Sequence, residues 1–522
     1  MPRPCASRIL VVPGSKPEFY IGWVSAMPHL CAQGATTILF CASLVFVPAA
    51  FGQDRSSQDE ASQEQITQSQ GGNDPLLLID QNGFMLRGHL QAGVNGVVEH
   101  NLFWDLADLV APGVDTDAQW LEGYIEPGLS FSLDLDNSVV VYGKVSAIAS
   151  GTLGIDAFDT GNTGAITLEE GYLALRTTNQ NGPKIDLSIG PRDFVAGSGM
   201  LLANGGSNGF ERGALKLGPH KAWGMAALGT LGLDEVKGTA FYLEPNEQRD
   251  NETGTKIVGV DLRYDRTTQT FAGVTLGHVP ESTSPYPRPA PGGVGAPEII
   301  PDGRKGLSFV NLYGRGNPFE PDNENFFVSG DIAYEWNPRI DMSAWGGRAQ
   351  IGYTFADAPW TPSISYTYQT FSGDDPLTSR YERFDPLYYE GSPDAWATGS
   401  KSSLVFNNSN VNAHQLALSV KPTAVDTITL RYAHIRANEL GSPIQFGQGS
   451  RFIDVSGRLY QITGVTNAHL SDDFFIEYNR VLSPNAFLTA GFSVSIPGEG
   501  IREITQKDTI WSGGFVNVVV NF

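Results

Sequence analysis

Segments of about ten residues, in which apolar side chains alternate with polar or small ones, recur from Gly83 to Phe522 and constrain the fold more than any other feature. Successive side chains of a strand point to opposite faces, so this period of two indicates strands with one dry face. Turns rich in Gly, Pro, Asn and Asp separate the segments. Two architectures fit the pattern: a soluble sandwich with a dry interior, or a transmembrane antiparallel β-barrel with a dry exterior and a wet lumen.

Three features favour the barrel. The chain ends on FVNVVVNF, a strand closed by an aromatic residue, as in outer-membrane barrels, so Phe522 is predicted to be the signal that the barrel-assembly machinery reads. Aromatic residues stand at many segment ends, as expected of interfacial girdles. Short turns alternate with long connections at about 279–305, 373–409 and 437–467, which a barrel carries on its extracellular side.

The number of strands follows from a parity argument. We count nineteen candidates, but a barrel with both chain ends in the periplasm needs an even number. Residues 222–229 (AWGMAALG) lack a clean alternation and are the weakest candidate. Without them the prediction is an all-β fold, a barrel of eighteen strands with short periplasmic turns, with sixteen strands as the alternative.

The first residues do not belong to this pattern. Residues 35–50 form an uncharged, mostly apolar run that is shorter than the ~20 residues of a membrane-spanning helix. We therefore expect a signal peptide at 1–52, with Met1 or Met27 as the start, then a Gln/Ser-rich periplasmic leader at 53–82 and the barrel at 83–522. All three cysteines precede residue 53, so the exported chain has no disulfide or thiolate metal site.

Charge and motifs exclude several functions. The formal charge is -22, which repels nucleic acid. No phosphate-binding loop, nucleophile motif or H-E-x-x-H helix is present, so we expect no enzyme, no cofactor and no energy coupling. A polysaccharide-degrading enzyme that uses Glu170 with Asp186 is a minor alternative.

No metal site is predicted either. We interpret the strand histidines His89, His414 and His434 as structural or lumen residues. The acidic pairs Asp374-Asp375 and Asp472-Asp473 could bind Ca²⁺ or bridge lipopolysaccharide, but are read as solvated loop ends.

Several stretches resemble a known family. They are residues 187–202 (LSIGPRDFVAGSGMLL), 210–217 (FERGALKL), 383–391 (RFDPLYYEG), 437–448 (ANELGSPIQFGQ) and 472–481 (DDFFIEYNRV). The first two resemble the Gly-Arg strand, Gly-rich connection and Arg-containing next strand of the alginate export family. The resemblance implies an eighteen-stranded outer-membrane barrel whose basic lumen passes an anionic polysaccharide outward. Pro191 splits the family's Gly-Arg pair here, so the direction of the Arg192 side chain is open by one position.

The lumen candidates follow from strand parity. The predicted pore-lining or substrate-binding residues are Arg87, Arg192, Arg212, Arg263, Arg348, Lys421 and Arg431. Inward acidic residues nearly balance the basic ones, so these side chains either neutralise one another or form a cationic selectivity ring. A candidate gating loop carries Arg380, Arg383, Asp385 and Lys401, which either fold into the pore or contact lipopolysaccharide phosphates.

The function predicted from these features is a passive channel in the bacterial outer membrane that exports an anionic, alginate-like polysaccharide. The alternative is a general or uptake porin for small solutes or oligosaccharides. The expected partners are membrane lipid, lipopolysaccharide, and the anionic polysaccharide or a small anionic solute.

Overall fold

The computed structural model describes residues 76–522 apart from 111–112, 114, 137, 159–160, 179–181, 296, 320–324, 390–404, 445–450, 456–457 and 463. The chain divides into two compact units, Met1–Leu39 and Phe40–Phe522, and every described residue belongs to the second. The predicted signal peptide, residues 53–75 of the predicted leader and the candidate gating residue Lys401 lie outside the described residues, whereas the end of the leader forms β1 (Leu77–Gln81).

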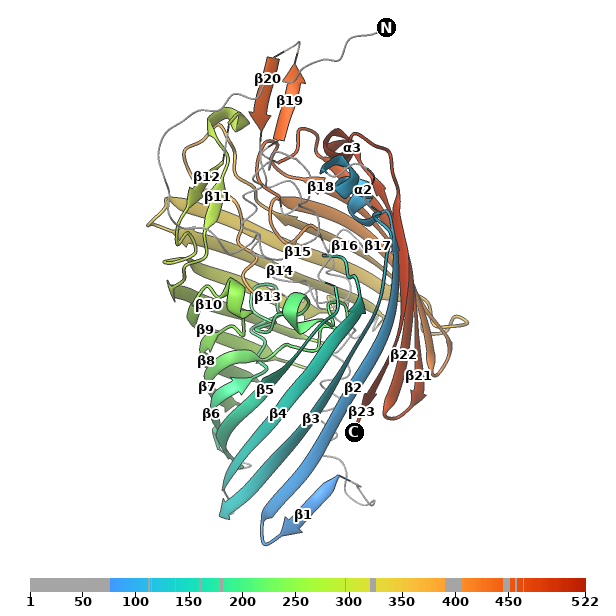
Figure 1. Ribbon diagram of the computed structural model, residues 1–522. Helices are drawn as coiled ribbons and strands as arrows, with labels where there is room; N and C mark the ends of the chain where they lie inside the picture. The colour runs from blue at the N-terminus through green and yellow to red at the C-terminus, as the bar shows by residue number, and fades with distance from the viewer. Residues whose placement is uncertain are drawn as a thin grey trace. The chain divides into compact units, whose positions relative to one another are not determined.

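A closed antiparallel β-barrel of eighteen strands forms the body of the protein (Figure 1). The barrel strands are β2 (Phe84–His100), β3 (Ala118–Asp136), β4 (Val139–Gly154), β5 (Thr163–Thr177), β6 (Lys184–Arg192), β7 (Trp223–Leu233), β8 (Val236–Glu244), β9 (Lys256–Asp265), β10 (Phe271–Glu281), β13 (Ser308–Gly316), β14 (Phe326–Asn337), β15 (Met342–Thr354), β16 (Ser363–Phe371), β17 (Val411–Thr423), β18 (Asp426–Ala437), β21 (His469–Ser483), β22 (Ala486–Pro497) and β23 (Trp511–Asn521). The smaller elements are β1 (Leu77–Gln81), β11 (Tyr286–Arg288), β12 (Glu298–Ile300), β19 (Arg451–Val455), β20 (Arg458–Ile462), α2 (Leu102–Val110), α3 (Glu499–Thr505), η1 (Phe210–Arg212), η2 (Arg249–Asn251) and η3 (Pro291–Gly293).

The first and last barrel strands close the ring. β2 pairs with β23 on one side and with β3 on the other, and Figure 1 shows the blue and red strands side by side. The backbone of Phe522 extends the seam, because its N–H donates to Leu90 O at 2.8 Å and its carbonyl accepts from Leu90 N at 3.0 Å. β1 is the nineteenth strand of the sheet and pairs with the first residues of β2.

The predicted strand count is confirmed, but the reason given for it was wrong. Residues 222–229, which the parity argument discarded, fall almost entirely within β7, where the ladders to β6 and β8 hold a strand whose small residues hide the alternation. Residues 210–217, expected to form the next Arg-containing strand, instead form η1 and irregular backbone. Their polar backbone groups are satisfied locally and by other strands, as when Ala214 N donates to Thr152 Oγ1 at 2.9 Å.

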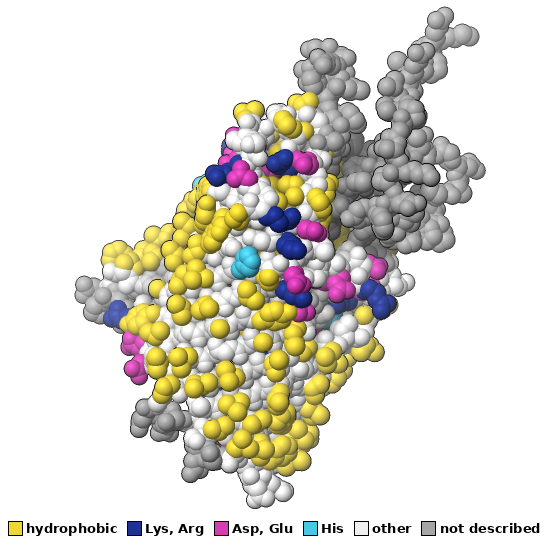
Figure 2. Space-filling model, turned by 90° about the vertical axis from the view of Figure 1, so that its left-hand side faces the viewer, with side chains coloured by type: hydrophobic (Ala, Val, Ile, Leu, Met, Phe, Trp, Pro, Cys, Tyr) yellow, Lys and Arg dark blue, Asp and Glu magenta, His cyan; other side chains and the backbone are white. Residues whose placement is uncertain are grey.

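The outer face of the barrel is apolar. Ile166 is 81% exposed and Ile332 is 60% exposed, and they are two of many large aliphatic side chains on this face. Figure 2 shows such side chains spread over one face, with charged ones gathered above them. Tyr334 and Trp336 stack near a strand end with ring centroids 5.9 Å apart, in the position of an interfacial girdle. No helix in the described part of the chain is long and apolar enough to cross a membrane.

The two ends of the barrel differ in the length of their connections. Two-residue turns such as 234–235, 424–425 and 484–485 join strands at one end, which is typical of the periplasmic side. The three predicted long connections are found at the other end, at 282–307, 372–410 and 438–468. A fourth long connection, 193–222 between β6 and β7, was not predicted.

Glycines on the inner wall make room for aromatic rings of neighbouring strands. A Cβ at Gly277 would lie 2.2 Å from a ring carbon of Phe309, and one at Gly93 would lie 2.5 Å from the ring of Tyr124. Both distances are shorter than van der Waals contact, so only glycine fits at these two positions. This packing accounts for part of the high glycine content of the chain.

Candidate functional site in the barrel lumen

The connection 193–222 folds inward and crosses the lumen. Near its start, Ser198 Oγ donates to Asp331 of β14 and accepts from Arg348 Nη2 of β15 at 3.2 Å. Near its end, the N–H of Leu217 donates to Glu122 of β3 at 2.6 Å. β3 and β14 are about half the ring apart in strand order, so this crossing connection joins opposite walls.

Buried carboxylates fix the far end of the crossing connection. Lys216 Nζ lies 2.7 Å from Glu99 Oε1 of β2, and its backbone N–H donates to Glu122 Oε2 at 3.1 Å. Both carboxylates are about 1% exposed. The indole N–H of Trp511 donates to the other oxygen of Glu99 at 2.9 Å, and that of Trp120 donates at 3.1 Å to Glu122 Oε2, the same oxygen that the Lys216 N–H binds. A buried carboxylate needs such partners, so this set holds the connection in one position.

Arg212 ties the crossing connection to the connection between β8 and β9. Its Nη1 donates to the carbonyl oxygens of Ser207 and Asn246, each at 3.0 Å, and its Nη2 donates to Asn246 Oδ1 at 2.9 Å and to Glu247 O at 3.0 Å. The side chain is buried. The structure thus places this predicted pore residue in η1, with its guanidinium directed at loop carbonyls.

His220 lies buried in the same connection. Its Nε2 is 3.0 Å from Ser150 Oγ of β4, and its Nδ1 is 3.2 Å from Glu169 Oε2 of β5. Glu169 also accepts the backbone N–H groups of Lys221 and Ala222, at 2.6 and 2.7 Å. Burial, with the charge of Arg212, lowers the pKa of His220 to about 3, so the ring is neutral at pH 7 in spite of the nearby carboxylate.

The first part of the 372–410 connection, residues 372–389, also folds inward and packs on the crossing connection. Tyr388 N donates to Leu201 O at 2.9 Å, and Ala203 N donates back to Tyr388 O at 2.8 Å. Asp385 binds Arg304 of the 282–307 connection through two bonds, Nε to Oδ2 at 2.7 Å and Nη2 to Oδ1 at 2.9 Å. Burial opposes ionisation of Asp385, but the charge and hydrogen bonds of Arg304 hold the pKa of this carboxyl below its ordinary value.

The candidate gating residues therefore occupy different environments. Arg383 and Asp385 are buried within the inward segment, where the Arg383 guanidinium donates to Tyr381 Oη at 2.8 Å and Pro287 O at 3.3 Å. Arg380 is exposed, and its Nε lies 3.7 Å from Asp341 Oδ1. Described residues of this segment contact other connections and the wall, and its role as a gate stays a prediction.

Most of the predicted wall residues on strands share the faces that point into the lumen. Arg87 has the parity of the buried Asn95 and Val97, opposite to the exposed Val94 and Val98. By the same criterion Arg192, Arg263, Arg348 and Arg431 face the lumen, whereas the β17–β18 ladder shifts between Val420 and Thr423, so parity does not place Lys421. Arg192 keeps this direction in spite of Pro191, since it has the parity of the buried Ser188, and the extra residue of the β6–β7 register shift lies on β7. Its Nη1 donates to Ser188 Oγ at 2.6 Å.

Ion pairs involve several of the basic groups in the lumen. Arg348 Nη2 lies 3.1 Å from Asp331 Oδ2, and both side chains are buried. Arg263 Nε lies 2.7 Å from Asp265 Oδ1. Lys144 pairs with Glu170, whereas Asp186 accepts from Tyr142 Oη at 2.6 Å, so the two carboxylates of the enzyme alternative have different partners.

Sequence reasoning missed the aromatic partners of the lumen arginines. Among the described residues, five guanidinium groups lie over rings on the inner wall, and we call these residues the stacked arginines. They are Arg176 over Tyr142 at 5.1 Å from guanidinium carbon to ring centroid, Arg192 over Tyr172 at 4.3 Å, Arg263 over Phe271 at 4.0 Å, Arg315 over Phe327 at 4.5 Å and Arg431 over Phe475 at 5.4 Å. Each ring belongs to a strand next to that of its arginine, so these pairs can be found only when the register between the two strands is known.

The closed barrel, its lipid-facing apolar surface and its polar lumen define an outer-membrane β-barrel protein of bacteria. The family model for alginate export matches residues 308–510, which run from the start of β13 to the residue before β23. The resemblance to the alginate export family predicted from the sequence is thereby confirmed. This family and this fold are those of transport channels rather than enzymes.

Comparisons with curated proteins and with solved structures gave the following matches. No curated protein matches the chain. Among solved structures, OccK5 (OpdH) of Pseudomonas aeruginosa aligns with a TM-score of 0.45 and 10% identity over 83% of this chain and 98% of its own. OccAB1 of Acinetobacter baumannii gives 0.47 and 10% over 84% and 97%. OccK2 (OpdF) of P. aeruginosa, solved with glucuronate, gives 0.44 and 11% over 84% and 96%.

Proposed function

We propose that this outer-membrane channel passively exports an anionic polysaccharide, and that the stacked arginines form its path. The observation that carries the proposal is the row of guanidinium groups seated on aromatic rings around the inner wall. A guanidinium binds a carboxylate through paired, charge-assisted hydrogen bonds. A ring beneath the guanidinium already restricts the arginine side chain, so less conformational entropy is lost when the carboxylate binds. A wall that alternates such groups with apolar rings suits a uronate chain, which has carboxylates and apolar sugar faces.

The location of these residues supports the same proposal. Arg176, Arg263 and Arg315 lie within two residues of the periplasmic ends of β5, β9 and β13. Arg192 and Arg431 lie deeper, nearer to the level of the crossing connection. A polyanion that enters from the periplasm would meet one cationic contact after another before the narrow part of the lumen. Export then needs only a concentration difference, in keeping with the absence of an energy-coupling motif.

Planar bilayer recordings test the proposal. We expect the wild-type channel to prefer anions in a KCl gradient and to be blocked by an oligouronate more strongly than by a neutral oligosaccharide of equal length. Replacement of Arg192 and Arg431 by Gln should shift the reversal potential toward cations. It should weaken the oligouronate block by about tenfold or more, since a hydrogen bond to a charged group contributes ~1.5–3 kcal/mol.

A matched control is available outside the lumen. Arg480 of β21 has the parity of the lipid-facing Ile476, and its Nη1 lies 3.2 Å from Asp426 Oδ1. Arg480→Gln removes one positive charge near the periplasmic rim and should leave selectivity and block unchanged. Equal loss of block in this control and in the lumen variant would contradict a path formed by the stacked arginines.

The alternative function is a general or uptake porin for small solutes. It is favoured by the ion pairs Arg348–Asp331, Arg263–Asp265 and Lys144–Glu170, which neutralise charge on the wall. A porin of this kind would show weak ion selectivity, no preference for an oligouronate and little change in the Arg192 and Arg431 variant. The same recordings therefore separate the two functions.

A further inference from the structure

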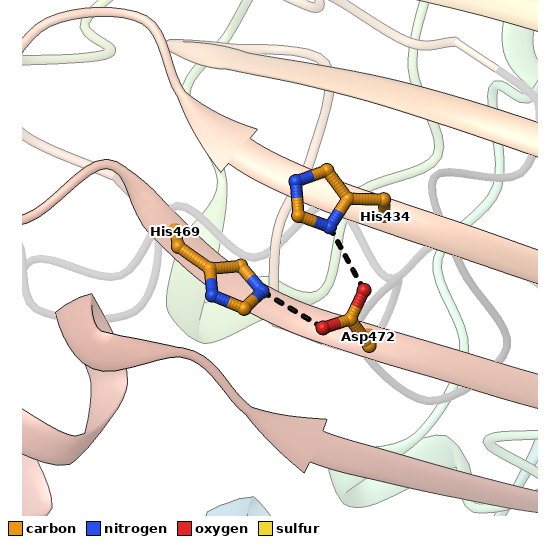
Figure 3. Close-up of side chains that lie close together, drawn as sticks. All are labelled: His434, His469 and Asp472. Carbon is orange, nitrogen blue, oxygen red and sulfur yellow. Dashed lines mark hydrogen bonds and ion pairs between the residues drawn. The ribbon is translucent and has the colours of Figure 1, made fainter.

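Two histidines and an aspartate form a compact cluster at the extracellular ends of β18 and β21 (Figure 3). His434 Nδ1 lies 2.8 Å from Asp472 Oδ1, and His469 Nε2 lies 2.9 Å from Asp472 Oδ2. One candidate ligand atom from each residue lies within 4.8 Å of the others. Figure 3 shows the Asp472 carboxylate with one oxygen directed at each imidazole ring, and the centroids of the two rings are 4.8 Å apart.

The register of the two strands creates this cluster. His434 is directly opposite Asp472 in the β18–β21 ladder, so their side chains share one face. The ladder shifts between Ile435 and Arg436, and Leu470 and Ser471 are both fully buried. This irregularity breaks the alternation and turns His469 to the face of Asp472, which a regular strand would not do.

The cluster faces outward and not into the lumen. His434 follows the parity of Leu430, and Asp472 follows that of Phe474 and Ile476, all of which are exposed on the apolar face. Tyr432 Oη donates to Asp472 Oδ1 at 2.8 Å, and its ring lies 5.0 Å from that of Phe474. The three cluster side chains are 23–31% exposed. They are thus accessible at the outer rim, separate from the path proposed above.

We propose that His434, His469 and Asp472 bind one divalent transition metal of the zinc class. Two imidazole nitrogens and one carboxylate suit Zn²⁺ and its neighbours, whereas Ca²⁺ and Mg²⁺ prefer oxygen ligands alone. Three protein ligands leave a fourth position for water or another donor from the membrane surface. Small side-chain rotations suffice to bring the three ligands around one metal ion, because both imidazole nitrogens already point at the Asp472 carboxylate.

Metal binding would join the two ends of the 438–468 connection. His434 lies four residues before its first residue, and His469 follows its last one. Ala437 N donates to Ala468 O at 2.8 Å at the same junction. A bound metal would add a link between β18 and β21 at this point, so it would hold the base of the connection more firmly.

Zinc titration of the purified full-length barrel tests the inference. The protein is prepared without a histidine tag in detergent micelles, and Zn²⁺ binding is measured by calorimetry, with Co²⁺ absorption as a spectroscopic readout. We expect about one ion per barrel. His434→Gln and Asp472→Asn should each weaken binding by more than about tenfold, since even the hydrogen-bond partners of metal ligands contribute that much.

Two other surface histidines provide controls. His100 Nδ1 lies 2.5 Å from Asp117 Oδ1, and no third candidate ligand joins this pair among the described residues; His278 of β10 is exposed, and its Nδ1 lies 2.8 Å from Ser308 Oγ. His100→Gln and His278→Gln should leave binding unchanged. Heat-modifiable migration in gels shows that each variant is a folded barrel.

For each folded variant, the zinc titration either supports or overturns the proposed metal site. Stoichiometric binding that is lost in the two cluster variants and kept in the two controls supports the site, as does slower amide exchange at Ala437 with Zn²⁺. Absence of binding by the wild type at micromolar Zn²⁺ would overturn it and leave a network of hydrogen bonds only. Equal loss in cluster and control variants would also overturn it.

Discussion

The ion pair between Arg304 and Asp385 should control the opening of the inward segment 372–389. Asp385→Asn keeps the shape of the side chain but removes the charge that two nitrogens of Arg304 bind at 2.7 and 2.9 Å. Both side chains are at most 5% exposed, so solvent screens the pair little. Removing one partner leaves the Arg304 charge buried, which typically costs about 3–5 kcal/mol. Exchange through local opening should then accelerate by about 10²- to 10⁴-fold, up to the limit set by the remaining stability of the segment.

Amide hydrogen exchange read by mass spectrometry measures this opening in the folded barrel. The N–H groups of Leu387 and Tyr388 report on it, because they donate to Asp385 Oδ1 and Leu201 O, each at 2.9 Å. At pH 7 the pair contributes fully. The folded pKa of Asp385 lies below its ordinary value, so the contribution is present above that value and is lost only as the pH falls through the folded pKa.

Arg380 in the same segment is the matched control. It is 53% exposed and its Nε lies 3.7 Å from Asp341, so Arg380→Gln should change the opening free energy by about 0–1 kcal/mol. Exchange of Leu387 and Tyr388 that stays as slow in Asp385→Asn as in the wild type would refute a controlling role of the ion pair. Acceleration of equal size in the Arg380 variant would refute it as well, since the effect would then not depend on burial.

Three further predictions concern the crossing connection and the seam. The folded pKa of His220 is about 3, below the ordinary 6.5, so the stability of residues 193–222 should be full above pH 6.5 and fall between pH 6.5 and 3. Amide hydrogen exchange, corrected for its intrinsic pH dependence, measures this stability. In His220→Gln the fall with pH should disappear. Arg212→Gln should increase channel noise in bilayer recordings, because a buried guanidinium that donates to Asn246 and Glu247 is lost; a recording as quiet as the wild type would contradict this. Removal of Phe522 should slow barrel assembly in cells, seen as a larger unfolded band in gels, because its two backbone hydrogen bonds to Leu90 close the seam; an unchanged band would count against it.

Strand parity predicted the wall of the barrel well. It placed side chains such as Arg348 and Arg431 on the lumen face, because alternation depends on local geometry alone. It failed at β7, where small residues occupy both faces and the pairing with neighbours decides the structure. It failed also at residues 210–217, where an alternating sequence is held in an irregular form by contacts with distant strands.

The contacts of the candidate site depend on pairs far apart in the chain. Ser198 meets Asp331, and Lys216 meets Glu99, only because the crossing connection spans the ring. The ring beneath each stacked arginine is set by the register between two strands, which composition does not encode. The zinc-class cluster depends on one irregular step in the β18–β21 ladder, so a regular strand pattern predicts no third ligand there.

The surroundings of each arginine separate those that hold the structure from those that can meet a solute. Arg212 and Arg304 are buried and donate to loop carbonyls or to a carboxylate, and Arg348 is buried beside Asp331, so removal of any of them disturbs the inward connections themselves. Arg192 and Arg431 are partly exposed on the wall and rest on rings, so their removal changes the charge of the lumen with less effect on its shape. A variant that replaced both a buried arginine and a stacked arginine could lose selectivity through a change in the inward connections or through a change in the charge of the lumen. Selectivity measured with the stacked arginines alone therefore reports on the path, and the buried arginines report on the connections that narrow it.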